Sequence, residues 1–365
     1  CLLLVPLGLG LAGLLFSKGR VTLKEFLVHE AAMLFLICLA YFLALCNRTS
    51  DTEVWNGTVV SKDRGTGSCC HSYPCNPHPC GCDKDGNNCS TCYDTCYEHS
   101  WDRTWSATSS NGETVYHQGC GRPGESDPGR WAAIRIGEPT AVEHTYTNYI
   151  KGNPDSILRR QGAADRFKGR LPSYPSVYDW YRIRRFIAIG VPVEGLDALN
   201  ARLSEINGRL GAMKKVNVVV VVVDESDQRY LEALRETWLG GKINDFVVVI
   251  GAPEFPAIAW AGVISWTRNE DLKVQVRDEI VALDAFDGSK ILDIVESDVE
   301  RKFEHRPISD FEYLKSTIEP SGTVTWIIGI LGVLLAIGLQ IYFWFEDPFG
   351  DGHAPYGWTR RIRFR

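Results

Sequence analysis

The sequence lacks a strong excess of charge of either sign, and it lacks the motifs of common catalytic and nucleotide-binding sites. Its 365 residues carry a formal net charge of −6, so the composition does not indicate a nucleic-acid-binding protein. It has no GxGxxG motif in a strand–helix setting, no phosphate-binding loop and no Ser–His–Asp order that predicts a nucleophilic triad. These absences favour a binding or structural role.

Charge is also absent from long apolar segments, and this predicts that the chain crosses a membrane. Residues 324–345 contain no charged side chain, and residues 26–46 are uncharged from Ala31 onward. Both are long enough for a transmembrane helix, which needs about 20 residues. Residues 1–16 are apolar but shorter, and they are interpreted as a truncated transmembrane segment or, alternatively, a signal-peptide core. Because the chain begins with Cys1, we expect it to be a fragment that lacks preceding residues.

Basic residues next to the apolar segments predict the orientation in the lipid bilayer. Positively charged flanks remain in the cytoplasm. Residues 47–322 are therefore predicted to lie outside the cytoplasm, and residues 346–365 form a basic cytoplasmic tail. The two basic groups are Lys18, Arg20 and Lys24 between the first two apolar segments, and Arg360, Arg361, Arg363 and Arg365 after the last.

Nine of the twelve cysteines fall within one short stretch. An extracytoplasmic compartment permits disulfides, but an odd number leaves one thiol unpaired, paired between chains or bound to metal. The nine residues are Cys69, Cys70, Cys75, Cys80, Cys82, Cys89, Cys92, Cys96 and Cys120.

A structural zinc site is the alternative to disulfides in this stretch. Cys89 and Cys92 form a CxxC pair, with Cys80 and Cys82 close by, although the spacing matches no standard zinc finger. Three histidines also lie within the cluster: His71, His78 and His99. Residues 83–88 resemble part of a calcium loop but lack the later Glu, so they are interpreted as a turn.

Residues 47–151 are predicted to form a small cysteine-rich β module. Short segments rich in β-prone residues indicate strands at 54–61, 114–117, 131–136 and 146–150. Residues 152–176 follow as a linker, because Gly, Pro and Ser are scattered through them. Five basic residues of this linker are interpreted as solvated or, alternatively, as facing a membrane or a partner: Arg159, Arg160, Arg166, Lys168 and Arg170.

Residues 177–320 are predicted to form an α/β domain. Residues 218–223 are an unbroken run of valines, typical of a strand covered on both faces, and residues 246–250 are a second apolar run. The helix predicted between them, at 230–238, allows a right-handed crossover. A helix at 196–210, a half-exposed strand at 272–277 and two further helices at 292–303 and 311–318 complete a three-layer α/β/α sandwich. We expect this domain to fold without the cysteine-rich module.

This order of elements resembles the TPM domain, an extracytoplasmic α/β/α domain also found in a photosystem II repair protein. The matching segments are VVVVVVDES, LRETWLGGK, DFVVVIGA, LKVQVRDEI and ERKFEHRPISDFEYLKS. The resemblance covers residues 185–320, and a membrane span directly after the domain is also typical of the family. Two features depart from the family pattern: Arg277-Asp278-Glu279 replaces a glycine-rich turn, and residues 254–267 look like an insertion.

The resemblance implies phosphatase or calcium-binding chemistry at one end of the sheet. Some members of the family are acid phosphatases and some bind calcium. Asp224 and Asp227 follow a strand where open α/β sheets place their sites, and Asp284 follows a later element, so the three predict a divalent-cation site. Alternatively, Asp224 and Asp227 cap the next helix.

Two functions are therefore predicted. One is a non-enzymatic, membrane-anchored protein that presents both extracytoplasmic modules for assembly or for binding an unknown protein partner. The other is a membrane-anchored phosphatase or divalent-metal-dependent hydrolase.

Overall fold

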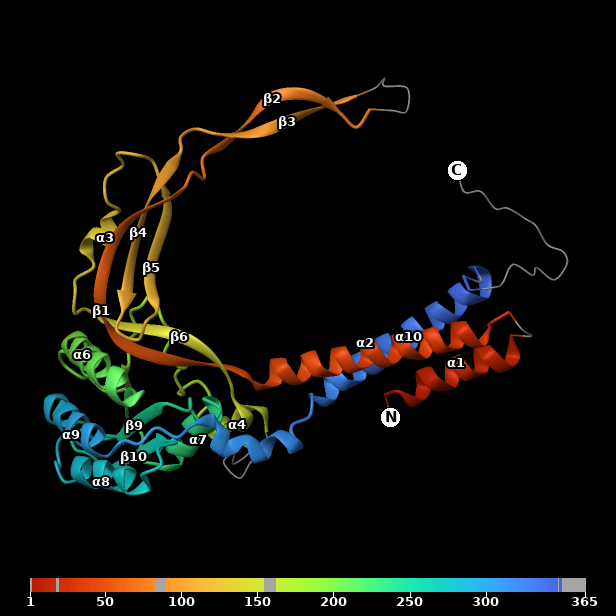
Figure 1. Ribbon diagram of the computed structural model, residues 1–365. Coiled ribbons are helices and arrows are strands. Elements are labelled where there is room, and N and C mark those ends of the chain that lie inside the picture. Colours follow the sequence, from red (N-terminus) through yellow and green to blue (C-terminus); the bar gives the residue numbers. More distant parts are fainter. Residues whose placement is uncertain (1, 18–19, 83–88, 154–161, 347, 350–365) are drawn as a thin grey trace. The chain divides into compact units, whose positions relative to one another are not determined.

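The computed structural model describes residues 2–17, 20–82, 89–153, 162–346 and 348–349. Several features predicted above lie outside these residues: Cys1, Lys18, the turn at 83–88, Arg159, Arg160 and the basic tail from residue 350. The chain divides into two compact units (Figure 1). The first contains Cys1–Ser50, Tyr149–Asn153 and Tyr313–Arg365, and the second contains Asp51–Asn148 and Pro154–Glu312.

The first unit is a bundle of three apolar helices with one short helical turn beside them. Met33, Ile37 and Ala336 form its buried core. Within the described residues, α2 and α10 are long and apolar enough to cross a bilayer, whereas α1 is shorter. The two long helices contain the predicted segments 26–46 and 324–345. The helices are α1 (Leu4–Phe16), α2 (Leu23–Thr49), α4 (Tyr149–Gly152) and α10 (Gly322–Glu346).

Polar contacts tie these helices together at one end of the bundle. The His29 ring is fully buried, with Nδ1 2.9 Å from Glu30 Oε1 and Nε2 3.3 Å from the Ala336 carbonyl oxygen. A Cβ at Gly10 would collide with both side chains, so α1 approaches α2 closely at this glycine. Arg20 lies 5.0 Å from the Trp344 ring centroid, which places the α1–α2 connection at the C-terminal end of α10.

A curved antiparallel sheet forms the first part of the second unit. Its strand order is β5-β4-β1-β6, and Val59, Trp105, Ala107, Val115 and Tyr116 supply its buried core. Trp131 packs against this core from a short helix, α3 (Gly129–Ala133), so the predicted strand at 131–136 was wrong. Pro128 sits at the start of that helix, and the buried residues of the segment are Trp131 and Ile134, three positions apart. The strands are β1 (Ser50–Ser68), β4 (Trp101–Ser109), β5 (Thr114–Gly121) and β6 (Pro139–Thr147).

A two-stranded ribbon continues from this sheet. It consists of β2 (Ser72–Cys80) and β3 (Ser90–Tyr97), which pair antiparallel. Nearly every ribbon residue is exposed or half-buried, because no other layer covers it. An isolated two-stranded ribbon is marginally stable at best in water, so this one requires covalent support.

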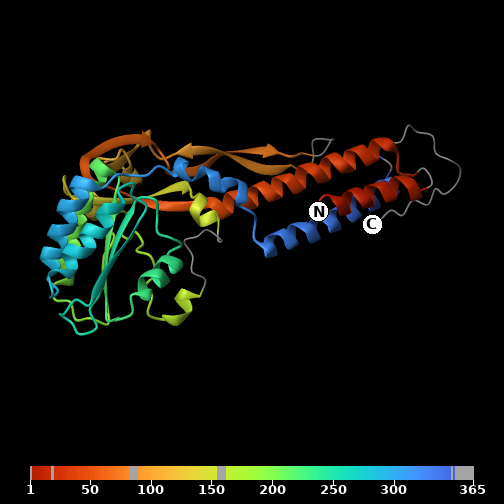
Figure 2. The ribbon, with the colours of Figure 1, turned by 90° about the horizontal axis from the view of Figure 1, so that it is seen from below.

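The α/β domain is the second part of the same unit, and its central strands are buried on both faces. Its sheet has the order β10-β9-β8-β7, in which β7, β8 and β9 are parallel and β10 is antiparallel. α6, α8 and α9 cover one face, where alternate valines of β8 point, and α7 covers the other (Figure 2). The strands are β7 (Phe186–Ile189), β8 (Asn217–Val223), β9 (Asp245–Gly251) and β10 (Trp260–Ser265).

The elements of this domain confirm the predicted mixed α/β character but correct the predictions for three segments. The segment predicted as a strand at 272–277 belongs to α8, and part of the presumed insertion at 254–267 is strand β10. The helix predicted at 311–318 is a 3₁₀ helix, η1 (Ile308–Thr317). The other helices are α5 (Ala163–Arg166), α6 (Leu196–Lys214), α7 (Arg229–Thr237), α8 (Glu270–Val281) and α9 (Gly288–Lys302).

A buried polar network joins the antiparallel sheet to the α/β domain. The Asn56 side chain on β1 donates to the Val216 carbonyl at 3.0 Å and to Asn217 Oδ1 at 3.2 Å. Its own oxygen accepts from Arg185 Nη1 at 2.5 Å, and Arg185 is 2% exposed. α6 meets β1 closely at Gly211, where a Cβ would collide with Asn56. The two parts therefore share one interior.

Candidate functional site

Eight of the nine clustered cysteines lie in four pairs at disulfide distance, which agrees with the disulfide interpretation of the sequence. The pairs are Cys70–Cys120, Cys75–Cys96, Cys80–Cys92 and Cys82–Cys89. The last three staple the β2–β3 ribbon and its tip. The cysteines favoured by the zinc interpretation are all paired, so none of them is a free thiolate ligand: Cys80, Cys82, Cys89 and Cys92.

Cys69 is the cysteine left over, and its thiol lies in a cluster of titratable groups. Only 8% of Cys69 is exposed, and it forms no disulfide. Its Sγ, one ring nitrogen each of His71 and His99, and a carboxylate oxygen of Asp102 all lie within 4.8 Å of one another. Within the described part of the chain, one other group of this kind exists, and it combines Asp102 with a disulfide pair.

The four residues come from both connections between the antiparallel sheet and the ribbon. Cys69 and His71 lie between β1 and β2, His99 lies between β3 and β4, and Asp102 is the second residue of β4. Figure 1 shows this junction where β1 and β4 give way to β2 and β3. The chain therefore brings two segments about thirty residues apart to one point by pairing their strands.

Asp102 is the centre of the cluster, because its carboxylate contacts three polar groups. Oδ1 lies 2.5 Å from His99 Nε2 and 3.1 Å from His71 Nδ1, and Oδ2 accepts from the Cys70 N–H at 2.6 Å. Burial raises the pKa of Asp102, but the hydrogen bonds from His99 and from the Cys70 N–H outweigh it and lower the pKa to about 2. The side chain is 1% exposed and ionised, so it attracts a cation.

Two of the carboxylates predicted to form a divalent-cation site, Asp224 and Asp227, are paired with arginines. Arg170 pairs with both Asp224 and Glu225, and Asp227 pairs with Arg166 at 2.7 Å. Asp227 Oδ1 also accepts from the Arg229 N–H at 3.0 Å, but the N-cap residue of α7 is Gln228 and it makes no side-chain cap hydrogen bond, so Asp224 and Asp227 are not the predicted caps. The hydrogen bond from Arg229 lowers the pKa of Asp227 to about 2.

Asp284, the third predicted ligand, is not brought to these two aspartates as part of a ligand group. It lies after α8, where its backbone carbonyl accepts from the Ile258 N–H at 3.0 Å. Among the described residues, no ligand group within 4.8 Å contains Asp224, Asp227 and Asp284 together. The divalent-cation site stays a prediction that these contacts do not favour.

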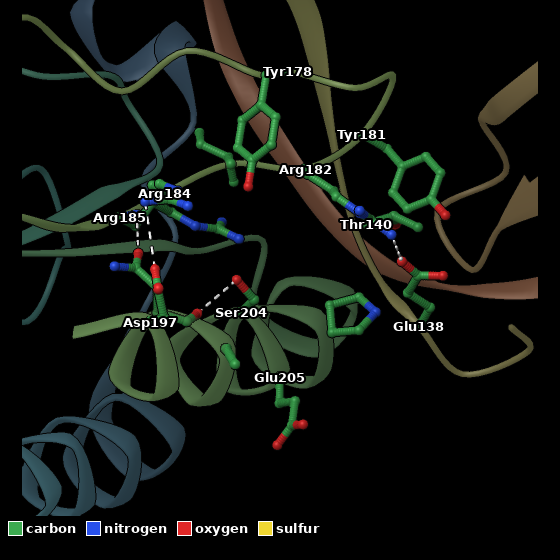
Figure 3. A pocket seen from close by; sticks show the side chains of 14 residues that line it. Glu138, Thr140, Tyr178, Tyr181, Arg182, Arg184, Arg185, Asp197, Ser204 and Glu205 are labelled. Atoms are coloured by element: carbon green, nitrogen blue, oxygen red, sulfur yellow. Dashed lines mark hydrogen bonds and ion pairs between the residues drawn. The ribbon is translucent and has the colours of Figure 1, made fainter. Parts of the chain in front are cut away.

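A cavity of about 410 Å³ lies between β6 and α6. Figure 3 shows the charged side chains that line it, with Arg182 turned toward Glu138 at 2.9 Å. Arg184 lies 3.4 Å from Asp197, and the Asn200 side-chain oxygen accepts a hydrogen bond from the Arg185 N–H. Because these groups pair with one another, the cavity offers no concentrated charge to a ligand.

Sequence reasoning found part of the Cys69 cluster and missed the rest. The odd cysteine count indicated a leftover thiol, and His71 and His99 stood out as histidines among the cysteines. Asp102 was missed because it carries no local motif. Its proximity to Cys69 depends on the β1–β4 register, in which Gly67 pairs with Asp102.

Comparisons of the chain with protein-family models, with curated proteins and with solved structures find no match. The resemblance to the TPM family therefore stays a prediction, and the function is inferred from the geometry of this chain.

Proposed function

We propose that this protein is a membrane-anchored, non-enzymatic protein that presents its second unit outside the cytoplasm and binds a protein partner through the β2–β3 ribbon. The observation that carries the proposal is the ribbon itself, a disulfide-stapled element whose tyrosines are exposed. Tyr73 is 47% exposed, and Tyr93 and Tyr97 are each 57% exposed. Tyrosine is enriched at protein interfaces because it combines a large apolar ring with a polar hydroxyl.

The register of the ribbon distributes these tyrosines over two faces. Tyr93 and Tyr97 lie four residues apart on β3, so they share one face. Tyr73 pairs with Cys96 and therefore lies on the opposite face. The disulfides along the ribbon fix its conformation before binding, which reduces the conformational entropy lost when a partner binds.

The free edge of β3 supports recognition of an extended segment. Among the residues that the structure describes, no third strand joins the β2–β3 sheet. β3 contains no proline, so each of its residues retains a backbone N–H. Strand addition at such an edge is a common mode of peptide recognition, with main-chain hydrogen bonds supplying affinity.

The anchoring and the orientation rest on separate observations. α2 and α10 are each long enough to cross a bilayer, and disulfides are typical of oxidising compartments outside the cytoplasm. The contact of Arg20 with Trp344 gathers a basic residue and an aromatic belt residue at one end of the bundle, as expected for a cytoplasmic face.

Site-specific photo-cross-linking in intact cells tests partner binding. A benzophenone amino acid placed at Tyr93 or Tyr97 is expected to give a discrete cross-linked species that contains this protein and one other polypeptide. Tyr178, which is 46% exposed but lies outside the ribbon, is the matched control. The proposal fails if the ribbon positions give no such species, or if Tyr178 gives the same one.

Phosphatase assays separate this proposal from the hydrolase alternative. The purified full chain, assayed with and without divalent cations, is expected to show no turnover that depends on Asp224. Activity that is abolished by Asp224→Asn would favour the hydrolase instead.

Labelling with a membrane-impermeant maleimide tests the orientation. Glu254→Cys is expected to react from outside the cell and Thr359→Cys to react only after permeabilisation, each in a chain in which Cys1, Cys38, Cys46 and Cys69 are replaced by serine. The reverse pattern would contradict the orientation. Glu254 is exposed in the second unit, and Thr359 belongs to the basic tail.

A further inference from the structure

We propose that Cys69, His71, His99 and Asp102 bind one Zn²⁺ ion at the junction between the antiparallel sheet and the β2–β3 ribbon. This site differs from the zinc site that the CxxC spacing indicated, because the cysteines of that site are paired in disulfides. The site proposed here uses the unpaired thiol of Cys69.

The donor atoms match the chemistry of zinc. Zn²⁺ is bound by cysteine thiolate, histidine nitrogen and carboxylate oxygen, and its structural sites are four-coordinate. One thiolate and one carboxylate supply two negative charges, and two neutral imidazoles complete the set, so the charge of the ion is balanced. Ca²⁺ and Mg²⁺ require several oxygen ligands, and this cluster offers one carboxylate, from Asp102.

The spacing of the donor atoms also fits. A tetrahedral zinc with ligands about 2.0–2.3 Å away holds its ligand atoms about 3.3–3.8 Å apart. The separation of 3.1 Å between Asp102 Oδ1 and His71 lies just below this range, the separation of 2.5 Å between Oδ1 and His99 lies about 0.8 Å below it, and the whole group falls within 4.8 Å. Small side-chain rotations would therefore bring the four donor atoms to the spacing of a tetrahedral site. Contacts to the ion would then replace the two His–Asp contacts.

The surroundings hold the donors in place. The Cys70 N–H donates to Asp102 Oδ2 and leaves Oδ1 for the ion, as carboxylate ligands are commonly oriented by outer hydrogen bonds. Cys70 is itself fixed to Cys120 on β5, and Asp102 is held in the β1–β4 ladder. The exposed fractions of the His71 and His99 side chains are 24% and 20%, which gives a solvated ion a path to the site.

The position of the site gives it a structural role. Both chain connections between sheet and ribbon pass through it, so a bound ion would fix the ribbon at its base. The disulfides act only within the ribbon and between Cys70 and β5, and none joins the two connections at Cys69 and His99. Four protein ligands leave no open coordination position, which is typical of structural and not catalytic zinc.

Metal analysis of the full chain tests the proposal. The protein is purified in detergent without reductant, loaded with Zn²⁺, and dialysed against metal-free buffer. About one zinc per chain is expected to remain. Cobalt loaded in its place is expected to show the charge-transfer absorption of a cobalt–thiolate bond.

Single substitutions assign the ligands. Cys69→Ser and His99→Gln are each expected to weaken zinc binding by at least about tenfold. His78→Gln is the matched control, because His78 is a histidine of the same ribbon that lies outside the cluster. Zinc retained at full stoichiometry by the double variant Cys69→Ser/His99→Gln would overturn the proposal.

A chemical measurement covers the case in which these variants fail to fold. In the variant Cys1→Ser/Cys38→Ser/Cys46→Ser, Cys69 is the remaining unpaired thiol. Zn²⁺ is expected to slow its alkylation by iodoacetamide, whereas Mg²⁺ is not. An alkylation rate that is unchanged by Zn²⁺, or a cobalt spectrum without the thiolate band, would overturn the proposal.

Discussion

Asn56 is the residue through which the antiparallel sheet holds the buried Arg185. Its amide satisfies the Val216 carbonyl, the Asn217 oxygen and the Arg185 guanidinium together. We predict that Asn56→Ala lowers the free energy of unfolding by about 2–3 kcal/mol, because it leaves buried polar groups without partners. Thermal or denaturant unfolding of the second unit, followed in the purified full chain, measures the change.

Thr58→Ala is the control for this prediction. It removes the Asn56-Gly57-Thr58 glycosylation sequon and leaves the amide network intact, so the unfolding midpoint should not move. Because Asn56 is 3% exposed, we also expect no glycan there in a eukaryotic host. Equal destabilisation by both substitutions would show that the amide network contributes nothing specific.

Asp245 makes stability depend on pH. It is buried beside Asn217 and Tyr174, and burial raises its pKa to about 6, although hydrogen bonds from Asn217 and the Lys242 N–H offset part of the effect. The unfolded chain has a pKa of about 3.9 at this group, so between these values the folded state binds more protons. This group's contribution to stability is therefore present at low pH and is lost as the pH rises from about 4 through 6.

Denaturant unfolding at several pH values measures this dependence. We expect Asp245 to reduce the free energy of unfolding by on the order of 2–3 kcal/mol across that interval. Asp245→Asn should remove this part of the slope, whereas Asp293→Asn, at an exposed carboxylate on α9, should leave it unchanged. Parallel pH profiles for the wild type and Asp245→Asn would contradict the prediction.

Among the elements, the β2–β3 ribbon depends most on covalent bonds, because it has no core of its own. A disulfide contributes about 2–4 kcal/mol, mainly by restricting the unfolded chain. We predict that Cys80→Ser/Cys92→Ser makes the ribbon much more sensitive to limited proteolysis and leaves the α/β domain protected. Cys38→Ser/Cys46→Ser, which changes unpaired cysteines of α2, is the control. Cleavage sites and rates that match the wild type would count against the stapled ribbon.

The elements also show what the sequence could predict. β8 and β9 were predictable because each is an apolar run too short for a helix and buried on both faces. α8 was not, because Leu272, Val274 and Val276 alternate with polar residues as in a strand. The same segment also has Leu272, Val276 and Ile280 at helical spacing, and these three are fully buried while Val274 is 48% exposed. Two periodicities fit one segment, and tertiary packing selected the helix.

The Cys69 cluster was harder to predict for a different reason. A local motif reports ligands that are close along the chain, whereas His99 and Asp102 reach Cys69 only through strand pairing. The register of that pairing includes a shift between Cys75 and His78, which no count of residues reveals.

At the scale of the whole molecule, the shared interior changes one expectation from the sequence. The sequence predicts a domain at 177–320 that folds alone, but Ile183 packs with Val54 and Ala141 of the antiparallel sheet, and Arg185 is hydrogen-bonded to Asn56. We now predict that residues 177–320 alone are several kcal/mol less stable than residues 51–320, because these partners are lost. Thermal unfolding of the two segments compares them, and equal midpoints would show that the domain is independent.

The prolines of β2 limit the symmetry of any assembly that forms through the β2–β3 ribbon. Three of the nine residues of β2 are proline (Pro74, Pro77 and Pro79), and they lack the N–H that a further strand would need, whereas β3 has none. If two copies of the chain paired through their β3 edges, the outer strands of the resulting four-stranded sheet would both be β2. Such an assembly ends as a closed two-fold dimer, because neither outer strand can template another. Strand addition to the ribbon would therefore end at β2 instead of continuing into a fibre.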